Sequence, residues 1–342
     1  MRILFAGSPE IAVPALRLLA ERHEIVGVLS NPETEQGRGR IVSATPVALA
    51  AAGLPGGPVP VLPFERLGAE ARDAVSGLHP DLLVSFAYGK IFGPRFLALF
   101  PMGGLNVHPS LLPRYRGPAP IPAAILARDA ETGVSVQRLA LEMDSGELYA
   151  VARIPLGGRE TTAGLSATAA QVGARLLADV VDAIAEGRAV SVPQTGEASY
   201  CTMIAKSDGL IDWNMSCLDI DARIRAYDPW PVAHTYLRGK KLDLLESVPW
   251  PDGVELLSPG VSSPVSSPAV SSAVSSPVSS AGTIVGLDKS RGLMVQTKDG
   301  LVALTRLRFS TRKALSYKEF ANGVRDLAGA VLGGGLEDSL SK

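Results

Sequence analysis

Cysteine is scarce in this sequence: Cys201 and Cys217 are the only two in 342 residues. They form neither a CxxC pair nor a disulfide framework, which argues against a disulfide-stabilised secreted domain and a cysteine metal site. No apolar run reaches the roughly 18 residues that would suggest a membrane helix. The first residues have one basic side chain and a short apolar run ending at Gly7, unlike a signal peptide. We therefore expect a soluble, cytoplasmic protein that needs no metal and no membrane.

A large excess of charge of one sign is also missing, because the formal net charge is -1. One region departs from this balance: between residues 283 and 325 basic side chains outnumber acidic ones nine to three. Such a region can attract a polyanion. An ordinary solvated surface explains the same charges, and charge alone does not choose between the two readings.

Dinucleotide-binding glycines are absent from the first turn, although the chain opens like a nucleotide-binding fold. Residues 2–6 and 25–29 are apolar runs typical of buried strands, and helical spacing of apolar residues lies between them. The first turn has only Gly7, and Pro9 lacks an N–H for a pyrophosphate. A nicotinamide dehydrogenase is therefore disfavoured, and no phosphate-binding P-loop is present either.

The length and the order of the patterns indicate two domains. For residues 1–187, with further strands such as 81–86 and 104–108 and a long helix over 162–186, we expect an α/β fold. This is a Rossmann-like, open, twisted and mostly parallel sheet with helices on both faces. Residues 188–207 lack a clear period and are expected to be a linker.

Short apolar–polar alternations in residues 208–330 predict a small C-terminal β-barrel, OB-like in type, although the pattern alone does not separate a barrel from a sandwich. Residues 258–281 consist almost entirely of Ser, Pro, Val, Ala and Gly, which predicts a flexible insertion in this domain. We expect a flexible tail over residues 331–342 and a monomeric protein.

Asn106 and His108 are the most unusual polar residues of the first domain. They are two positions apart at the carboxyl end of an expected strand, so both side chains point to one face, where open sheets bind ligands. An amide that stabilises an oxyanion beside an imidazole that moves a proton suits attack of an amine on a carbonyl carbon. A strand-end pair satisfied by turn backbone fits the spacing equally well.

Asp144 lies in a polar turn between two expected strands. A carboxylate beside the imidazole would fix its tautomer and stabilise its cationic form. Aspartate is also common in turns for purely local reasons, and the sequence pattern favours that structural reading.

The segment from Asn106 to Gly117, followed some thirty residues later by Asp144 and Gly146, closely resembles the signature of the folate-dependent formyltransferases. The resemblance covers nearly the whole chain apart from the Ser/Pro-rich tract and the last dozen residues. It includes the N-terminal nine residues, Asp212-Trp213 and Pro229-Trp230-Pro231. The pieces in the second half favour the members of that family that act on methionyl-tRNA.

This resemblance implies a catalytic trio of Asn106, His108 and Asp144 and the co-substrate 10-formyltetrahydrofolate, with initiator methionyl-tRNA as partner. It implies folate contacts from two short loops, which consist of Ser110, Leu111, Leu112, Pro113 and of Ala87, Tyr88, Gly89. It also implies tRNA contacts from Arg38 and Arg40, which the basic second domain extends with Arg306, Arg308, Arg312 and Lys313. Two departures stand out: residues 32–36 lack the usual loop pattern of the family, and residues 258–281 match no feature of it.

In the expected mechanism, Asn106 and a protonated His108 stabilise the tetrahedral oxyanion. His108 also moves the proton from the amine to the folate nitrogen, while Asp144 holds His108 or a shared water. Three alternatives stay open: a formyltransferase for another amine, a hydrolase of formyltetrahydrofolate, and a non-catalytic tRNA-binding protein. The basic C-terminal half disfavours the first, and the intact trio disfavours the last.

Overall fold

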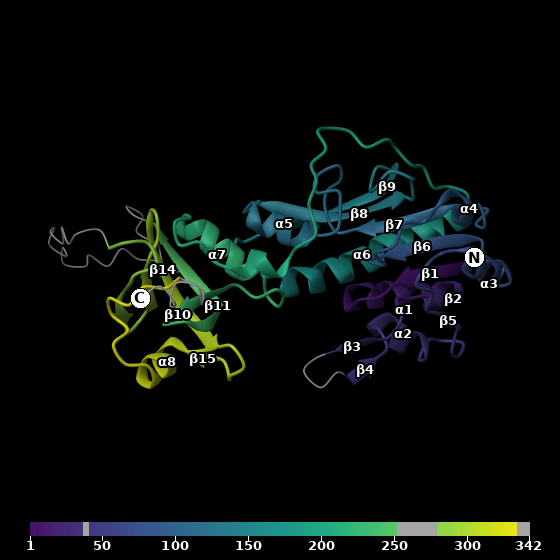
Figure 1. The fold of residues 1–342 in the computed structure, drawn as a ribbon. Coiled ribbons are helices and arrows are strands. Elements are labelled where there is room, and N and C mark those ends of the chain that lie inside the picture. Colours follow the sequence, from purple (N-terminus) through teal and green to yellow (C-terminus); the bar gives the residue numbers. More distant parts are fainter. Residues whose placement is uncertain (37–40, 252–278, 334–342) are drawn as a thin grey trace. The chain divides into compact units, whose positions relative to one another are not determined.

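A computed structural model describes residues 1–36, 41–251 and 279–333. The chain divides into two compact units, Met1–Met203 and Ile204–Lys342 (Figure 1). Among the described residues, no helix combines the length and the apolar character that crossing a membrane requires.

The first unit is built on a seven-stranded sheet in the order β5-β2-β1-β6-β7-β8-β9. Its strands are β1 (Arg2–Gly7), β2 (Glu24–Leu29), β5 (Val61–Leu62), β6 (Leu82–Phe86), β7 (Gly104–His108), β8 (Glu131–Arg138) and β9 (Leu148–Pro155). The strands from β5 to β7 run parallel, whereas β8 and β9 add to β7 in antiparallel fashion. The predicted open, mostly parallel sheet is therefore confirmed. A separate pair, β3 (Thr34–Gln36) and β4 (Ile41–Ser43), was not anticipated from the sequence.

Helices of this unit begin where the sequence provides a suitable first turn. Thr45 and Thr161 cap α2 and α6 through their hydroxyl oxygens, and proline occupies the first turn of four helices, where its missing N–H is harmless. The bounds are η1 (Glu10–Ala12), α1 (Val13–Arg22), α2 (Pro46–Ala51), α3 (Ala69–Ser76), α4 (Pro94–Leu97), α5 (Pro120–Leu126) and α6 (Thr162–Ala185). The long helix expected from residue 162 is present, with α1 packed beside it (Figure 1).

The packing of α6 on the sheet decides which way β7 faces. A Cβ at Gly173 would lie 3.1 Å from Val107 Cγ1 and 3.3 Å from Val134 Cγ1, so the glycine lets the helix approach the sheet closely. Val107 therefore faces α6, and its neighbours Asn106 and His108 face the opposite side of the sheet.

The second unit contains antiparallel strands in the order β10-β11-β14-β13-β12, with β15 beside β14. The bounds are α7 (Cys217–Ala226), β10 (His234–Leu237), β11 (Lys240–Pro251), β12 (Ile284–Asp288), β13 (Gly292–Gln296), β14 (Gly300–Phe309), β15 (Leu315–Ser316) and α8 (Tyr317–Gly323), preceded by a 3-10 turn, η2 (Lys206–Gly209). Their inward residues, including Trp213, Ile220 and Phe320, form one apolar core.

Closure of this sheet depends on residues expected to lie in the C-terminal tail. Val331 forms a bridge with Thr283, just before β12, and Leu332 forms one with Leu237 of β10. The two edges of the sheet are thereby linked, and residues 331–333 belong to the antiparallel domain. Most of the Ser/Pro-rich insertion predicted over residues 258–281 lies outside the described residues.

Candidate active site

The structure brings the three predicted catalytic side chains together at the carboxyl end of β7. Asp144 reaches this point from the turn between β8 and β9. Asn106 Nδ2 donates a hydrogen bond of 3.2 Å to Asp144 Oδ1, and His108 Nδ1 lies 3.5 Å from Asp144 Oδ2. Residues 38 positions apart along the chain thus form one polar cluster.

The Asp144 carboxylate is held by donors from several elements. Oδ1 accepts a second hydrogen bond from Gln137 Nε2 of β8 at 2.8 Å, and Oδ2 accepts one from the backbone N–H of Gly117 at 2.9 Å. Hydrogen bonds to a charged acceptor are stronger than neutral ones. The carboxylate therefore has a fixed orientation, and the Pro109–Gly117 loop is tied to the Asp144 turn.

The turn that carries Asp144 explains the spacing of the Asp-x-Gly motif. Asp144 has a φ of 51°, a left-handed conformation that is costly for a residue with a Cβ. A Cβ at Gly146 would lie 1.8 Å from the carbonyl oxygen of Arg138, so only glycine fits at that position. The motif thus combines a strained aspartate with a glycine that lets the turn close on β8.

His108 is buried, with 4% of its surface exposed, and both of its ring nitrogens face oxygens. Nε2 lies 2.8 Å from the carbonyl oxygen of Tyr115, which can only accept, so the neutral ring carries its hydrogen there and keeps a lone pair on Nδ1. Burial is the largest influence on the His108 pKa and lowers it, while Asp144 and the Tyr115 carbonyl act in the raising direction. The direction of this pKa shift favours a neutral imidazole in the resting site. The protonated His108 expected from the sequence belongs to the tetrahedral intermediate and stays a prediction.

The Tyr115 carbonyl that receives His108 is itself fixed. Tyr115 has a φ of 57°, its N–H donates to Ser199 Oγ at 2.9 Å, and its hydroxyl donates to Asp129 Oδ2 at 2.8 Å. These contacts come from two segments distant in sequence. They orient an otherwise ordinary loop carbonyl toward the imidazole.

The predicted folate loop is more buried than a ligand-contacting loop needs to be. Ser110 is fully buried, and its hydroxyl donates to the Arg114 carbonyl at 2.6 Å. Ser135 of β8 donates to the Ser110 carbonyl and accepts from the Leu112 N–H. The Leu112 and Pro113 side chains are buried as well, and that of Leu111 is half-buried. Ser110 and Leu112 therefore shape the loop from inside, and Leu111 is the side chain of the four nearest to solvent.

The second segment predicted to contact folate also contains both exposed and buried residues. Ala87 and Gly89 are exposed and have positive φ values of 52° and 80°. The Tyr88 ring is buried, packs on Phe92 at 5.6 Å between centroids, and has a hydroxyl with no partner among the described residues. Burial raises the pKa of Tyr88 to about 12. Tyr88 thus belongs to the core, and the exposed turn beside it is what a ligand could touch.

The residues predicted to contact tRNA differ in their exposure and in whether they form an ion pair within the protein. Arg308 donates to the buried Asp243 at 2.9 Å, which is a structural role, and Arg306 forms an exposed pair with Glu246 at 3.2 Å. Arg312 and Lys313 are exposed in the turn after β14. Arg38 and Arg40 lie outside the described residues.

Sequence reasoning did not find four residues that organise this site, namely Tyr115, Gly117, Gln137 and Gln194. Gly117 could have been found from the sequence, since it ends the signature segment. In the structure a Cβ at this position would lie 2.3 Å from the Cys201 carbonyl oxygen, which explains the glycine. The two glutamines carry no sequence signal, because nothing in their neighbours distinguishes them from exposed polar residues.

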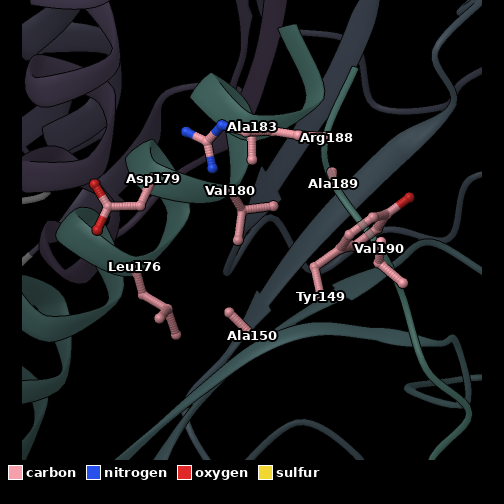
Figure 2. Close-up of a pocket in the computed structure, with 9 residues that line it drawn as sticks. All are labelled: Tyr149, Ala150, Leu176, Asp179, Val180, Ala183, Arg188, Ala189 and Val190. Atoms are coloured by element: carbon pink, nitrogen blue, oxygen red, sulfur yellow. The ribbon is translucent and has the colours of Figure 1, made fainter. Parts of the chain in front are cut away.

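A separate depression lies between β9, α6 and the residues that follow α6 (Figure 2). It is lined by Tyr149, Ala150, Leu176, Asp179, Val180, Ala183, Arg188, Ala189 and Val190. Its volume of about 200 Å³ is below the 300 Å³ or more that small-molecule sites usually offer. No catalytic candidate lines it. Among the described residues, no group of three or more His, Cys, Asp or Glu side chains could hold a metal ion.

Comparison with known proteins gives matches that together extend over nearly the whole chain. Residues 1–181 match the formyl transferase family, and residues 203–325 match the formyl transferase C-terminal domain. A methionyl-tRNA formyltransferase from Treponema denticola is 40% identical over 98% of this chain and 100% of its own length. Proteins of the same name from Roseiflexus castenholzii and Borrelia hermsii are 38% and 34% identical, each covering at least 97% of this chain and 99% of its own.

Solved structures of lower identity share the fold. An N-formyltransferase from Helicobacter canadensis, solved with folinic acid and dTDP-3-aminofucose, covers 88% of this chain and 97% of its own, with a TM-score of 0.59 at 16% identity. HypX from Aquifex aeolicus, solved with tetrahydrofolic acid, covers 96% of this chain and 48% of its own, with a TM-score of 0.58 at 17% identity. Because family models match both units in chain order and full-length relatives exceed 30% identity, the protein belongs to the formyl transferase family.

Proposed function

We propose that this protein transfers the formyl group of 10-formyltetrahydrofolate to the α-amino group of initiator methionyl-tRNA, as a cytoplasmic monomer. The observation that carries the proposal is the joining of Asn106, His108 and Asp144 into one hydrogen-bonded cluster. It occurs in a chain whose near full-length relatives are named for this reaction.

The reaction begins with attack of the neutral amine on the formyl carbon. A new N–C bond forms and the formyl oxygen becomes an oxyanion. The Asn106 amide uses one N–H on Asp144 and has a second N–H that can donate to this oxyanion. Collapse of the intermediate breaks the bond between the formyl carbon and the folate nitrogen, which leaves with a proton.

His108 carries the proton between the two nitrogens. With Nε2 hydrogen-bonded to the Tyr115 carbonyl, Nδ1 beside Asp144 is the ring nitrogen with a lone pair, and it accepts the proton that the attacking amine loses. The resulting imidazolium is stabilised by Asp144 on one side and by the Tyr115 carbonyl on the other. Because burial lowers the pKa of His108, the imidazolium is a stronger acid than an exposed one and can pass this proton to the folate nitrogen.

Recognition of the tRNA acceptor requires exposed positive charge. Arg312 and Lys313 are exposed cations of the second unit, and phosphates of tRNA are bound largely through such charges. Together with Arg306, and with Arg38 and Arg40 in the first unit, they form the proposed tRNA contacts. Arg308, also proposed from the sequence, links β14 to β11 through its ion pair with Asp243.

The test supplies 10-formyltetrahydrofolate with methionyl-tRNA, uncharged tRNA or glycinamide ribonucleotide and follows formylated product. We expect product only with methionyl-tRNA, and more from the initiator than from the elongator form. Formylation of the nucleotide would assign another amine. Release of formate without any acceptor would assign a hydrolase, and binding of tRNA without turnover would leave a tRNA-binding protein.

A further inference from the structure

Gln194 lies in the segment that follows α6, where most of its neighbours face solvent. Val192, Pro193, Thr195 and Gly196 are exposed, whereas the Gln194 side chain is half-buried and turned toward the Asp144 turn. The residue falls between the two parts of the chain that match the family, residues 1–181 and 203–325. Its contacts must therefore be interpreted from the structure itself.

The amide nitrogen of Gln194 holds the Asp144 turn through the main chain. Nε2 donates to the carbonyl oxygen of Asp144 at 2.8 Å and to that of Gly146 at 2.8 Å. The amide thus meets two carbonyls of the turn, that of the left-handed aspartate itself and that of the glycine two residues later. Because the turn holds Asp144 in a strained conformation, an external donor pair is a direct way to keep it there.

The amide oxygen of Gln194 faces Arg116, in the loop that follows His108. It accepts from Arg116 Nη2 at 2.8 Å and from Arg116 Nε at 3.3 Å, which settles the orientation of the amide. Backbone hydrogen bonds extend the same connection: Arg116 N–H donates to the Ser199 carbonyl and Cys201 N–H donates to the Arg116 carbonyl. The segment after α6 therefore fastens both loops that meet at the catalytic trio.

We infer that Gln194 is a positioning residue for the reaction: it holds the Asp144 turn against the Arg116 loop so that the Asp144 carboxylate meets Asn106 and His108. It touches no reacting atom. The inference rests on the proposed formyl transfer. It gives a role in that reaction to a residue of the segment between the two family-matched regions.

Two substitutions separate the contacts of Gln194. Gln194→Glu keeps an acceptor for Arg116 but presents carboxylate oxygens to the carbonyls of Asp144 and Gly146. Gln194→Met keeps the side-chain volume and removes both the donor and the acceptor. Thr195→Ala is the matched control, since it alters an exposed neighbour in the same segment. Each variant is compared with wild type in formylation of methionyl-tRNA and in thermal unfolding.

We expect Gln194→Glu to lower kcat by about 10- to 100-fold, the cost of a slightly misplaced catalytic group, with both KM values within about twofold. Gln194→Met should behave likewise and Thr195→Ala like wild type. In an Asp144→Asn background, adding Gln194→Glu should lower kcat by less than about threefold, because residues that act through one another are not additive.

The result that overturns the inference is a Gln194→Glu enzyme with wild-type kcat, or one whose loss is equally large in the Asp144→Asn background. If Gln194→Glu does not fold, the same comparison with Gln194→Met decides. If the wild type formylates methionyl-tRNA and the Gln194 variants do so equally well, only this inference is overturned. If the wild type itself does not formylate methionyl-tRNA, the proposed function is overturned and this inference with it.

Discussion

Asp144 in the first unit and Arg312 in the second are both charged residues in turns between or after strands, yet their surroundings differ completely. Asp144 accepts hydrogen bonds from Asn106, Gly117 and Gln137. Arg312 and Lys313 are exposed to solvent. A catalytic carboxylate must be positioned to a fraction of an ångström, whereas a cation that meets a phosphate needs only charge and access. Substitutions in the two regions should therefore fail in different ways.

Removal of a catalytic side chain should have the largest effect. We expect Asn106→Ala and His108→Ala each to raise the barrier by about 2.7–4 kcal/mol, a loss of roughly 10²–10³ in kcat, because each removes a group that stabilises the transition state. Single-turnover formylation of methionyl-tRNA measures this. A folded variant of either kind with full turnover would contradict the assignment.

Gly146→Ala tests whether the Asp144 turn needs its glycine. The added Cβ would lie 1.8 Å from the Arg138 carbonyl oxygen, so the turn must move away from β8. We expect a loss of about 1–3 kcal/mol in the free energy of unfolding together with a fall in kcat. Denaturant unfolding followed by circular dichroism gives the first quantity. Gly158→Ala, at an unobstructed but left-handed glycine, is the control for mere backbone strain.

The pKa of His108 gives a prediction with a definite sign. Burial lowers this pKa below its ordinary value of 6.5, so the ring should lose its proton at a lower pH than an exposed histidine. Asp144 acts to raise the pKa, so Asp144→Asn should shift the titration to still lower pH. The sequence has four histidines, so NMR titration against a His108→Ala spectrum assigns the signal. A His108 that titrates above 6.5 would contradict the neutral resting ring.

Substitutions of exposed cations in the second unit should change how the KM for methionyl-tRNA depends on salt. For Arg312→Ala combined with Lys313→Ala we expect an unchanged kcat, a higher KM for methionyl-tRNA, and a slope of log KM against log salt reduced by about one for each cation lost. Arg308→Ala should instead lower stability by about 1–3 kcal/mol, because it leaves Asp243 buried without its partner. An unchanged salt slope in the double variant would exclude these two residues from the tRNA surface.

Arg306→Ala should have the smallest effect. Its ion pair with Glu246 is more than half exposed on both sides, and such pairs contribute about 0–1 kcal/mol. We expect thermal unfolding close to wild type and a modest rise in the KM for tRNA. A large loss of stability would mean that Arg306 is structural like Arg308.

Much of the first unit could be predicted because its signals are local. Alternating runs of apolar residues and helical spacing located β1, β6, β7 and α6, and the two-residue spacing of Asn106 and His108 placed them on one face. The short helices α4 and α5 were not predicted, since neither is long enough for a periodic pattern. The closing bridges of Val331 and Leu332 join strands far apart in the chain and leave no local signal.

The sequence by itself determined the reaction class, through Asn106, His108 and the Asp-x-Gly turn, whose residue types and spacing resemble one family. Only the tertiary structure decided the direction in which the His108 pKa shifts and the partner of its Nε2, because the burial and the Tyr115 carbonyl come from residues that fold around it. It also decided that Arg308 faces Asp243 and that Gln194 reaches the Asp144 turn. Residue identity sets what a side chain can do, whereas its pKa and its partners depend on which distant segments the fold brings to it.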